Sequence, residues 1–136
     1  FPTKSFKQYN HWNFNGEPVS VFCGRIPLSE PETNILINFI TNNGIEILYS
    51  FHNRGREIMG NLHELSQKLA KDFAEKTGYK YVSDEDWKKV EQTGTLKEWC
   101  DENNIAYIEV EGSSRYSSGY RRQKNALVNA LNYFHG

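Results

Sequence analysis

Apolar side chains recur at helical spacing in three long segments of the chain, residues 31–42, 62–77 and 119–134. A shorter segment, residues 96–102, also has the character of a helix. In the longer segments the apolar positions lie three and four residues apart, with charged residues opposite them, which predicts amphipathic helices. Ser29 can cap the first helix and Pro31 suits its first turn, while Gly78 can accept the left-handed conformation that ends the second. We therefore expect four helices, the third of them short.

Two runs rich in strand-forming residues, 45–51 and 105–111, lie between these helices. Their apolar character indicates buried strands. Residues 1–30 predict an ordered loop with one short strand at 19–23, and residues 79–94 predict a polar loop that can contain one helical turn. Strands that alternate with covering helices indicate an α/β fold, a three-layer α/β/α domain with a mostly parallel sheet that spans residues 1–136.

Composition narrows the classes of partner that we expect. The chain has 136 residues and a net charge of −1, and 38% of its residues are hydrophobic, which is ordinary for a globular domain. Its longest basic cluster is Arg121-Arg122 with Lys124, beside Arg115, and this is too short to indicate a nucleic-acid partner.

Neither a signal peptide nor a run of about 18 apolar residues is visible, so no membrane span is expected. The compartment stays open: the cell envelope or the exterior if the substrate is the cell wall, and otherwise the cytoplasm. Cys100 lies in an apolar stretch and is expected to be a buried free thiol rather than a disulfide partner of Cys23.

Two residues with catalytic chemistry stand at the ends of the predicted strands. His52 follows the first strand directly, and Glu111 ends the second. Because functional groups in open α/β sheets gather beyond the carboxyl ends of the strands, the fold can bring a metal-type ligand and a general base together. Taken singly, His52 can also be a hydrogen-bonded histidine at a strand end, and Glu111 a solvated or ion-paired carboxylate.

Several short patterns follow one another along the chain: Phe1-Pro2, then Cys-Gly-Arg-Ile-Pro-Leu-Ser-Glu-Pro-Glu-Thr from Cys23, Leu-Tyr-Ser-Phe-His ending at His52, Gly-Thr-Leu-Lys-Glu-Trp from Gly94, and Ile-Ala-Tyr-Ile-Glu-Val-Glu from Ile105. In this order they resemble the zinc metallocarboxypeptidases of carboxypeptidase A-like fold. That family reads Asn-Arg-Asn-Phe-Pro, Tyr-x-Gly-x-x-Pro-x-Ser-Glu-Pro-Glu-Thr, a strand ending in histidine, Gly-x-x-x-x-Trp and Ile-Pro-x-x-Thr-x-Glu. Here Ala106 takes the place of the proline and Glu109 that of the threonine.

The resemblance implies a catalytic role for two residues. His52 would be the third protein ligand of a catalytic Zn²⁺, which keeps one position open for water. Glu111 would be the general base that activates this water and then protonates the leaving amine. Glu109 and Glu111 point to the same face of their strand, and Glu111 is preferred because it lies nearer the carboxyl end.

The resemblance also implies residues that contact substrate. Lys97 falls in the segment that shapes the specificity pocket of the family, where its charge could meet a substrate carboxylate; a solvated helix lysine is the alternative. Arg54 could clamp a carboxylate or be a turn-side cation. Tyr81 is taken as the tyrosine that covers bound substrate, with Tyr79 and Tyr107 as alternatives.

The bacterial branch that cuts γ-D-glutamyl–diamino-acid bonds of peptidoglycan stem peptides has the most similar sequence patterns, at His52 to Gly55, in Thr-Gly-x-Leu-Lys-x-Trp from Thr93, and at Glu111-Gly112. The resemblance covers only the C-terminal part of such a domain. The His-x-x-Glu motif that supplies the other zinc ligands is absent, since none of the four histidines has a glutamate three positions later. We therefore expect the chain by itself to be inactive and to bind no stoichiometric zinc.

Two other functions are compatible with the same fold, and the incomplete domain is also expected to self-associate. The same scaffold could act as an ordinary carboxypeptidase on peptide C-termini, or as a binding module without chemistry. An α/β domain without its front strands exposes a sheet edge, so self-association through 45–51 or 105–111 is expected.

Overall fold

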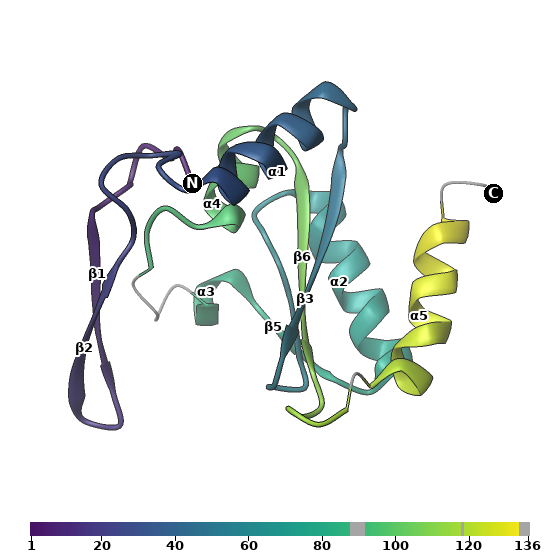
Figure 1. Ribbon diagram of the computed structural model, residues 1–136. Helices are drawn as coiled ribbons and strands as arrows, with labels where there is room; N and C mark the ends of the chain where they lie inside the picture. The colour runs from purple at the N-terminus through teal and green to yellow at the C-terminus, as the bar shows by residue number, and fades with distance from the viewer. Residues whose placement is uncertain (88–91, 118, 134–136) are drawn as a thin grey trace.

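A four-stranded sheet forms the centre of the computed structural model, which describes residues 1–87, 92–117 and 119–133 (Figure 1). The strands lie in the order β3-β6-β4-β5. Their bounds are Ile47–Asn53 for β3, Glu57–Gly60 for β4, Lys80–Val82 for β5 and Ala106–Gly112 for β6. β3 is parallel to β6 and β4 is parallel to β5, whereas β4 is antiparallel to β6. The sheet is therefore mixed, with two of its three pairings parallel.

Helices cover both faces of this sheet, which gives the expected three layers. Helices α2 (Glu64–Thr77) and α5 (Tyr120–Asn132) lie on one face, and α1 (Pro31–Asn42) and α4 (Leu96–Glu102) lie toward the other (Figure 1). The α2 and α5 side holds the larger apolar core, made of Ile58, Leu69, Ala70, Phe73, Ala74, Tyr79, Ile108, Val110 and Ala126. A second core lies under α1 and α4 and consists of Ile40, Trp99, Cys100, Ile105 and Tyr107. None of the described helices is long and apolar enough to cross a bilayer.

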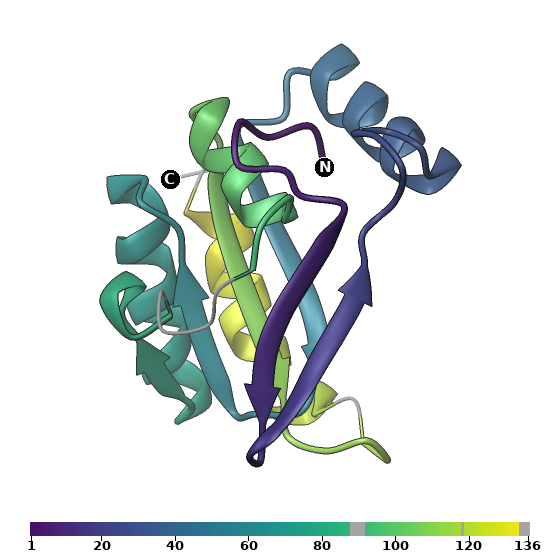
Figure 2. The same ribbon diagram turned by 90° about the vertical axis from the view of Figure 1, so that its left-hand side faces the viewer.

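A separate hairpin stands beside the main sheet, formed by β1 (Tyr9–Phe14) and β2 (Glu17–Phe22) (Figure 2). The expected strand at 19–23 is present as β2, which lies one or two residues earlier, whereas β1 falls where only loop was expected. Asn15 and Gly16 form the turn with φ values of 52° and 85°. An Asn-Gly pair between strand-forming segments is a strong signal for a tight hairpin, because both turn residues must adopt positive φ. That signal was present in the sequence.

The strands β4 and β5 were also not predicted, because they are too short to show an alternation of apolar and polar residues. They have four and three residues, and β4 owes its place to the burial of Ile58 and Met59. The longer strands lie one or two residues further along than predicted, and α3 (Asp84–Trp87) supplies the single helical turn in the polar segment. Part of that segment, and Phe134 of the last predicted helix, fall outside the described residues.

The ends of the helices follow local sequence rules in most places. Thr95 and Glu98 form a reciprocal capping box at the start of α4, and Gly78 ends α2 with a φ of 67°. The exception is Ser29. Glu30, not Ser29, is the N-cap of α1, and the Ser29 hydroxyl donates to the Glu30 carboxylate at 3.1 Å instead of capping the helix.

Both cysteines are free, and Cys100 is fully buried, as expected. Burial raises the pKa of the Cys100 thiol to about 12, and the nearby Asp101 charge acts in the same direction. The thiol therefore stays protonated at neutral pH and behaves as a small apolar side chain.

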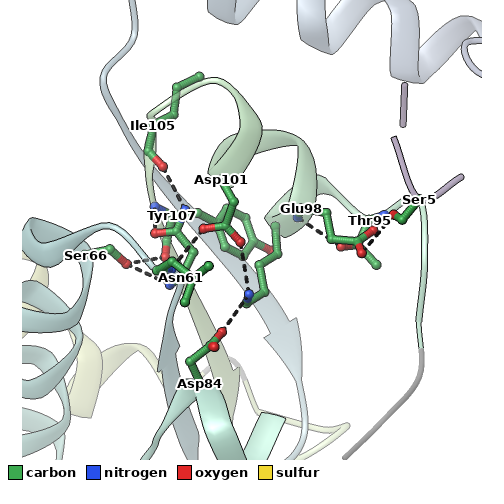
Figure 3. A network of polar contacts seen from close by, with 11 residues as sticks. Ser5, Asn61, Ser66, Asp84, Thr95, Glu98, Asp101, Ile105 and Tyr107 are labelled. Atoms are coloured by element: carbon green, nitrogen blue, oxygen red, sulfur yellow. Dashed lines mark hydrogen bonds and ion pairs between the residues drawn. The ribbon is translucent and has the colours of Figure 1, made fainter. Parts of the chain in front are cut away.

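The Asn61 side chain joins the end of β4 to the backbone at the start of β6. It is fully buried, its amide group donates to the carbonyl of Ile105 at 2.9 Å, and its carbonyl oxygen accepts from the N–H of Tyr107 at 3.0 Å. Its own N–H is within reach of the Tyr107 carbonyl and the Ser66 hydroxyl (Figure 3). The side chain thus continues the pairing of β4 with β6 beyond the last backbone pair.

We predict that Asn61→Ala lowers the free energy of unfolding by about 2–4 kcal/mol. The substitution leaves a buried N–H and a buried carbonyl without partners and opens a cavity. Chemical denaturation followed by circular dichroism measures this. Asn38→Ala, at an exposed position of α1, should change the same quantity by less than about 0.5 kcal/mol. Equal effects of the two substitutions would contradict the prediction.

Candidate active site

His52 and Glu111 lie directly beside each other at the carboxyl ends of two parallel strands. His52 on β3 is the register partner of Glu111 on β6, and neighbouring strands are about 4.8 Å apart. Both strands run in the same direction, so both residues reach the same edge of the sheet. The expected juxtaposition is present, and the catalytic roles of the two residues remain predictions.

The polar residues of both strands face a common cavity of about 770 Å³. Ser50 and His52 reach it from β3, and Tyr107, Glu109 and Glu111 reach it from β6. The alternate residues of each strand point the other way, into the core beneath α2. The alternation of a strand therefore separates a reactive face from a structural face.

His52 has a hydrogen-bonding partner on its own strand. The Ser50 hydroxyl lies 2.9 Å from His52 Nε2, and the imidazole is otherwise exposed toward the cavity. A hydrogen bond to one ring nitrogen orients the ring and defines which nitrogen remains available to a ligand. Here Nε2 is engaged, which leaves Nδ1 as the nitrogen that can take a further partner.

The turn that follows β3 holds the carboxylate of Glu111. The backbone N–H of Arg54 donates to Glu111 Oε2 at 3.0 Å. Gly55 approaches the same side chain so closely that an added Cβ would lie 2.9 Å from the Cβ of Glu111. The N–H groups of Gly55 and Arg56 both donate to the carbonyl of Gly112, which ties the turn to the end of β6. Glu111 is thus oriented by backbone rather than by a flexible side chain.

Glu109 lies deeper in the cavity and has a different environment. Burial raises the pKa of its carboxyl group; a hydrogen bond from Tyr107 and the charge of His52 oppose this shift, and the charge of Glu111 adds to it. Tyr107 Oη donates to Glu109 Oε2 at 2.7 Å, and burial raises the pKa of this phenol strongly. Tyr107 and Glu109 therefore form a fixed pair in the cavity wall, whereas Glu111 lies at its edge.

Lys97 is not a solvated helix lysine, so that alternative is wrong. Only 13% of its side chain is exposed, and its ammonium group lies 2.9 Å from Asp84 and 3.1 Å from Asp101. Figure 3 shows these two aspartates on either side of the lysine nitrogen. Burial lowers the pKa of Lys97, but the hydrogen bonds and charges of the two aspartates outweigh this and raise it overall. Its charge is therefore already balanced by protein carboxylates, which a substrate carboxylate would have to displace.

The three tyrosines divide between the two faces of the sheet. Tyr107 lines the cavity. Tyr81 packs against the core beneath α2, with Lys71 Nζ 5.4 Å from its ring centroid, and Tyr79 is buried in the same core. The structure therefore does not bring Tyr81 to His52 and Glu111. The side chain of Arg54 is exposed at the rim beside Glu111.

His52 is the zinc ligand that the family resemblance implies in this chain. Among the described residues no group of three or more histidine, cysteine, aspartate or glutamate side chains is arranged to hold a metal ion. These residues by themselves therefore do not fit a zinc site, which needs three protein ligands around an open position.

Three functional neighbours were missed by sequence reasoning. Ser50 precedes His52 by two positions, so the period of a strand could have placed it on the same face. Asp101 follows Lys97 by four positions, which is the spacing of an ion pair on a helix. Asp84 carries no such signal, because it lies on α3, thirteen positions before Lys97, and reaches it only through the tertiary fold.

Comparison with solved structures finds the same fold in thrombin-activatable fibrinolysis inhibitor. One crystal structure has a TM-score of 0.61 and 20% identity, over 80% of this chain and 33% of its own length. The bovine protein in complex with tick carboxypeptidase inhibitor has a TM-score of 0.61 and 18% identity, over 81% of this chain and 46% of its own length. This chain therefore spans less than half the length of each, and its fold resembles part of a carboxypeptidase A domain. No family model and no curated protein matches the sequence.

We predict that Gly55→Ala breaks the hydrogen bond between the Arg54 N–H and Glu111. The added methyl group has no room beside the Glu111 Cβ, so the turn or the strand end must shift. The exchange rate of the Arg54 amide hydrogen, followed by NMR, should increase. Gly16→Ala strains only the turn of the separate hairpin, where φ is 85°, and should leave the Arg54 amide unchanged. An Arg54 amide equally protected in both variants would show that Gly55 is not required.

Proposed function

We propose that this chain supplies His52 and Glu111 to the active site of a zinc-dependent peptidase of the metallocarboxypeptidase type. The observation that carries the proposal is the register pairing of these residues at the carboxyl ends of β3 and β6, facing a cavity. The likeness of the fold to part of a carboxypeptidase A domain supports it. His52 would be one zinc ligand, and the remaining ligands would come from another part of the same protein, since the described residues offer no complete set.

The residues of this chain can carry the proton transfers of peptide hydrolysis. Glu111 would accept a proton from the attacking water and pass it to the leaving nitrogen, which is general acid–base catalysis. Its carboxylate is held by the Arg54 N–H and so points in one direction before substrate arrives. Glu109 is less suited to this work, because its carboxylate is engaged by Tyr107.

For the substrate we propose the γ-D-glutamyl–diamino-acid bond of peptidoglycan stem peptides. The sequence patterns at Gly94 to Trp99 and at Glu111-Gly112, which resemble the bacterial branch, support this substrate. The cavity wall adds a physical argument: its lining includes the carboxylates of Glu98, Glu102, Glu109 and Glu111. These carboxylates suit the ammonium group at the free end of a diamino acid.

A second candidate is an ordinary carboxypeptidase that acts on peptide C-termini. The likeness to a protein crystallised with a carboxypeptidase inhibitor favours it. An assay of a longer protein that contains this chain and the remaining zinc ligands separates the two candidates. Stem peptides and simple peptides are offered to it as alternative substrates. A protein that binds stem peptide but hydrolyses neither substrate would be a binding module.

We predict that Glu111→Gln, in a protein that joins this chain to the missing zinc ligands, keeps zinc and fold but lowers turnover by roughly 10²–10⁴-fold. Glu109→Gln is the matched control, because it removes a carboxylate from the same face of the same strand, and it should lower turnover less than about tenfold. Steady-state kinetics with zinc analysis of each variant measures this. An inactive Glu109 variant beside an active Glu111 variant would reverse the assignment.

We also propose that the chain by itself associates with a second copy through β3. This strand has β6 as its one neighbour in the described sheet, so its other edge offers unpaired backbone groups. Phe51 on this strand is 47% exposed.

Sedimentation velocity should show a concentration-dependent dimer, and Phe51→Lys should weaken it, because a charge on an edge strand opposes pairing. Phe39→Lys, at a 59% exposed position of α1, should leave the dimer intact. A monomer at every concentration would refute the association.

A further inference from the structure

Six basic side chains that are scattered in the sequence gather at one end of the molecule, beyond the carboxyl ends of β3 and β6. We call this surface the basic rim. It consists of Arg54, Arg56, Lys80, Arg115, Arg121 and Arg122, all of them exposed. They come from the turn after β3, the start of β5, the loop after β6 and the first turn of α5, which meet at the lower end of the molecule in Figure 1.

Backbone and side-chain contacts hold these segments together at Gly112. Its carbonyl accepts the N–H groups of Gly55 and Arg56, at 3.0 and 3.2 Å. An added Cβ at Gly112 would lie 3.2 Å from Asn53 Oδ1 and 3.7 Å from Gln123 Nε2, so the first turn of α5 reaches the strand ends.

Further contacts join the side of the rim that faces α2. The carbonyl of Arg56 accepts the N–H of Lys80 at 2.9 Å. The guanidinium of Arg122 donates to the carbonyl of Thr77 at 3.4 Å and lies 5.9 Å from the ring centroid of Tyr79. The segments that carry the basic rim are therefore joined to one another at this end of the sheet.

The segments that carry the basic rim contain little negative charge, although Glu111 immediately precedes Gly112 and accepts a hydrogen bond from the Arg54 N–H. In residues 53–57, 78–80 and 112–122 the acidic residue is Glu57, which lies 3.5 Å from Lys80. Within the described part of the chain, Arg54, Arg56, Arg115 and Arg121 have no ion-pair partner. This local excess of cations occurs in a chain whose net charge is −1. Guanidinium groups bind carboxylates and phosphates through paired hydrogen bonds, so the basic rim suits an anionic ligand.

Two of these arginines are presented from backbone that ordinarily favours glycine. Arg54 has a φ of 140° and Arg56 a φ of 55°. Non-glycine residues with such values are uncommon and concentrate at functional sites, where the surrounding structure holds them in place. Hydrogen bonds on either side of the turn, to Glu111 and to Gly112, hold both arginines here.

We propose that the basic rim binds carboxylate groups on the part of the peptide substrate that extends away from Glu111. The inference rests on the proposed function, because it names a feature of the substrate of that site. Arg54 joins the two surfaces, since its N–H contacts Glu111 while its side chain belongs to the rim. A long polyanion such as nucleic acid fits less well, because the adjoining cavity is lined by Glu98, Glu102, Glu109 and Glu111 and would repel it.

Binding to the chain itself tests the proposal without requiring catalysis. We would titrate the ¹⁵N-labelled chain with hexaglutamate, with a neutral hexaserine peptide and with inorganic polyphosphate of similar charge. Hexaglutamate should shift the amide and guanidinium signals of Arg54, Arg56, Arg115 and Arg121, and added salt should weaken the binding. Hexaserine should produce no such shifts, and polyphosphate should bind no more tightly than hexaglutamate.

The double variant Arg54→Gln/Arg56→Gln should lower the affinity for hexaglutamate roughly 2- to 30-fold, which is the range expected for two exposed ion pairs. Lys7→Gln/Arg25→Gln is the matched control, because it removes the same charge from two exposed positions outside the rim. No binding, shifts spread evenly over the surface, equal loss in both double variants, or tighter binding of polyphosphate would each overturn the proposal.

Kinetics in the longer protein separate this inference from the proposed function. The Arg115→Gln/Arg121→Gln variant, at two exposed rim positions that do not hold Glu111, should raise KM for a substrate with flanking acidic residues, leaving kcat and the KM of a neutral analogue unchanged. If turnover depends on Glu111 but KM is unaffected by the double variant, the rim proposal fails and the proposed function stands. If hexaglutamate binds the rim but Glu111→Gln retains full turnover, the assigned catalytic role fails instead.

Discussion

The parallel pairing of β3 with β6 is the constraint on which the rest of the structure depends. Its register aligns Ile47 with Ala106 and Asn53 with Gly112. Because strand side chains alternate, a slip of one residue in either strand would turn its apolar residues into the cavity and its polar residues into the core. Ile108 and Val110 are fully buried, and burying each such side chain contributes about 1.5–3 kcal/mol, so the core holds the register. The apolar face of the sheet thereby determines where His52 and Glu111 lie.

The same pairing brings the strand ends close enough for backbone atoms to organise the site. Gly112 and Gly55 lack side chains where another group approaches closely. The turn that contains Gly55 can then donate to both the Gly112 carbonyl and the Glu111 carboxylate. This arrangement orients a carboxylate at little entropic cost, because no flexible donor has to be ordered. The turn also carries two arginines outward, so the element that positions the candidate base also begins the basic rim.

Charge inside the cavity is organised by packing between helices. Lys97 on α4 is surrounded by Asp101 one turn later and Asp84 from α3. A buried ion pair of this kind adds little net stability, but removal of one partner leaves a buried charge without compensation. The trio therefore specifies how α3 meets α4 more than how strongly the domain is folded. The two aspartates also neutralise the charge of Lys97 before any substrate arrives, which makes Lys97 less available to a substrate carboxylate.

Several features of this protein follow from the sequence alone. The helices at α1, α2, α4 and α5 are determined by local spacing and by caps such as Thr95 and Gly78, and the longer strands by continuous apolar runs. His52 and Glu111 could be chosen because both end such runs, where an α/β sheet collects its functional groups. The Asn15-Gly16 turn is equally local, because both residues adopt the positive φ values that such a pair favours.

What the sequence could not determine depends on long-range contacts. The strands β4 and β5 are too short for a period and exist because Ile58 and Met59 are buried between neighbours. The pairing of Lys97 with Asp84, the placement of Tyr81 away from the cavity and the gathering of Arg54 with Arg121 each join segments far apart in the chain. Local patterns record which side chains share a face of one element. Only the packing of elements against one another decides which faces meet, because that packing depends on the burial of the whole core at once.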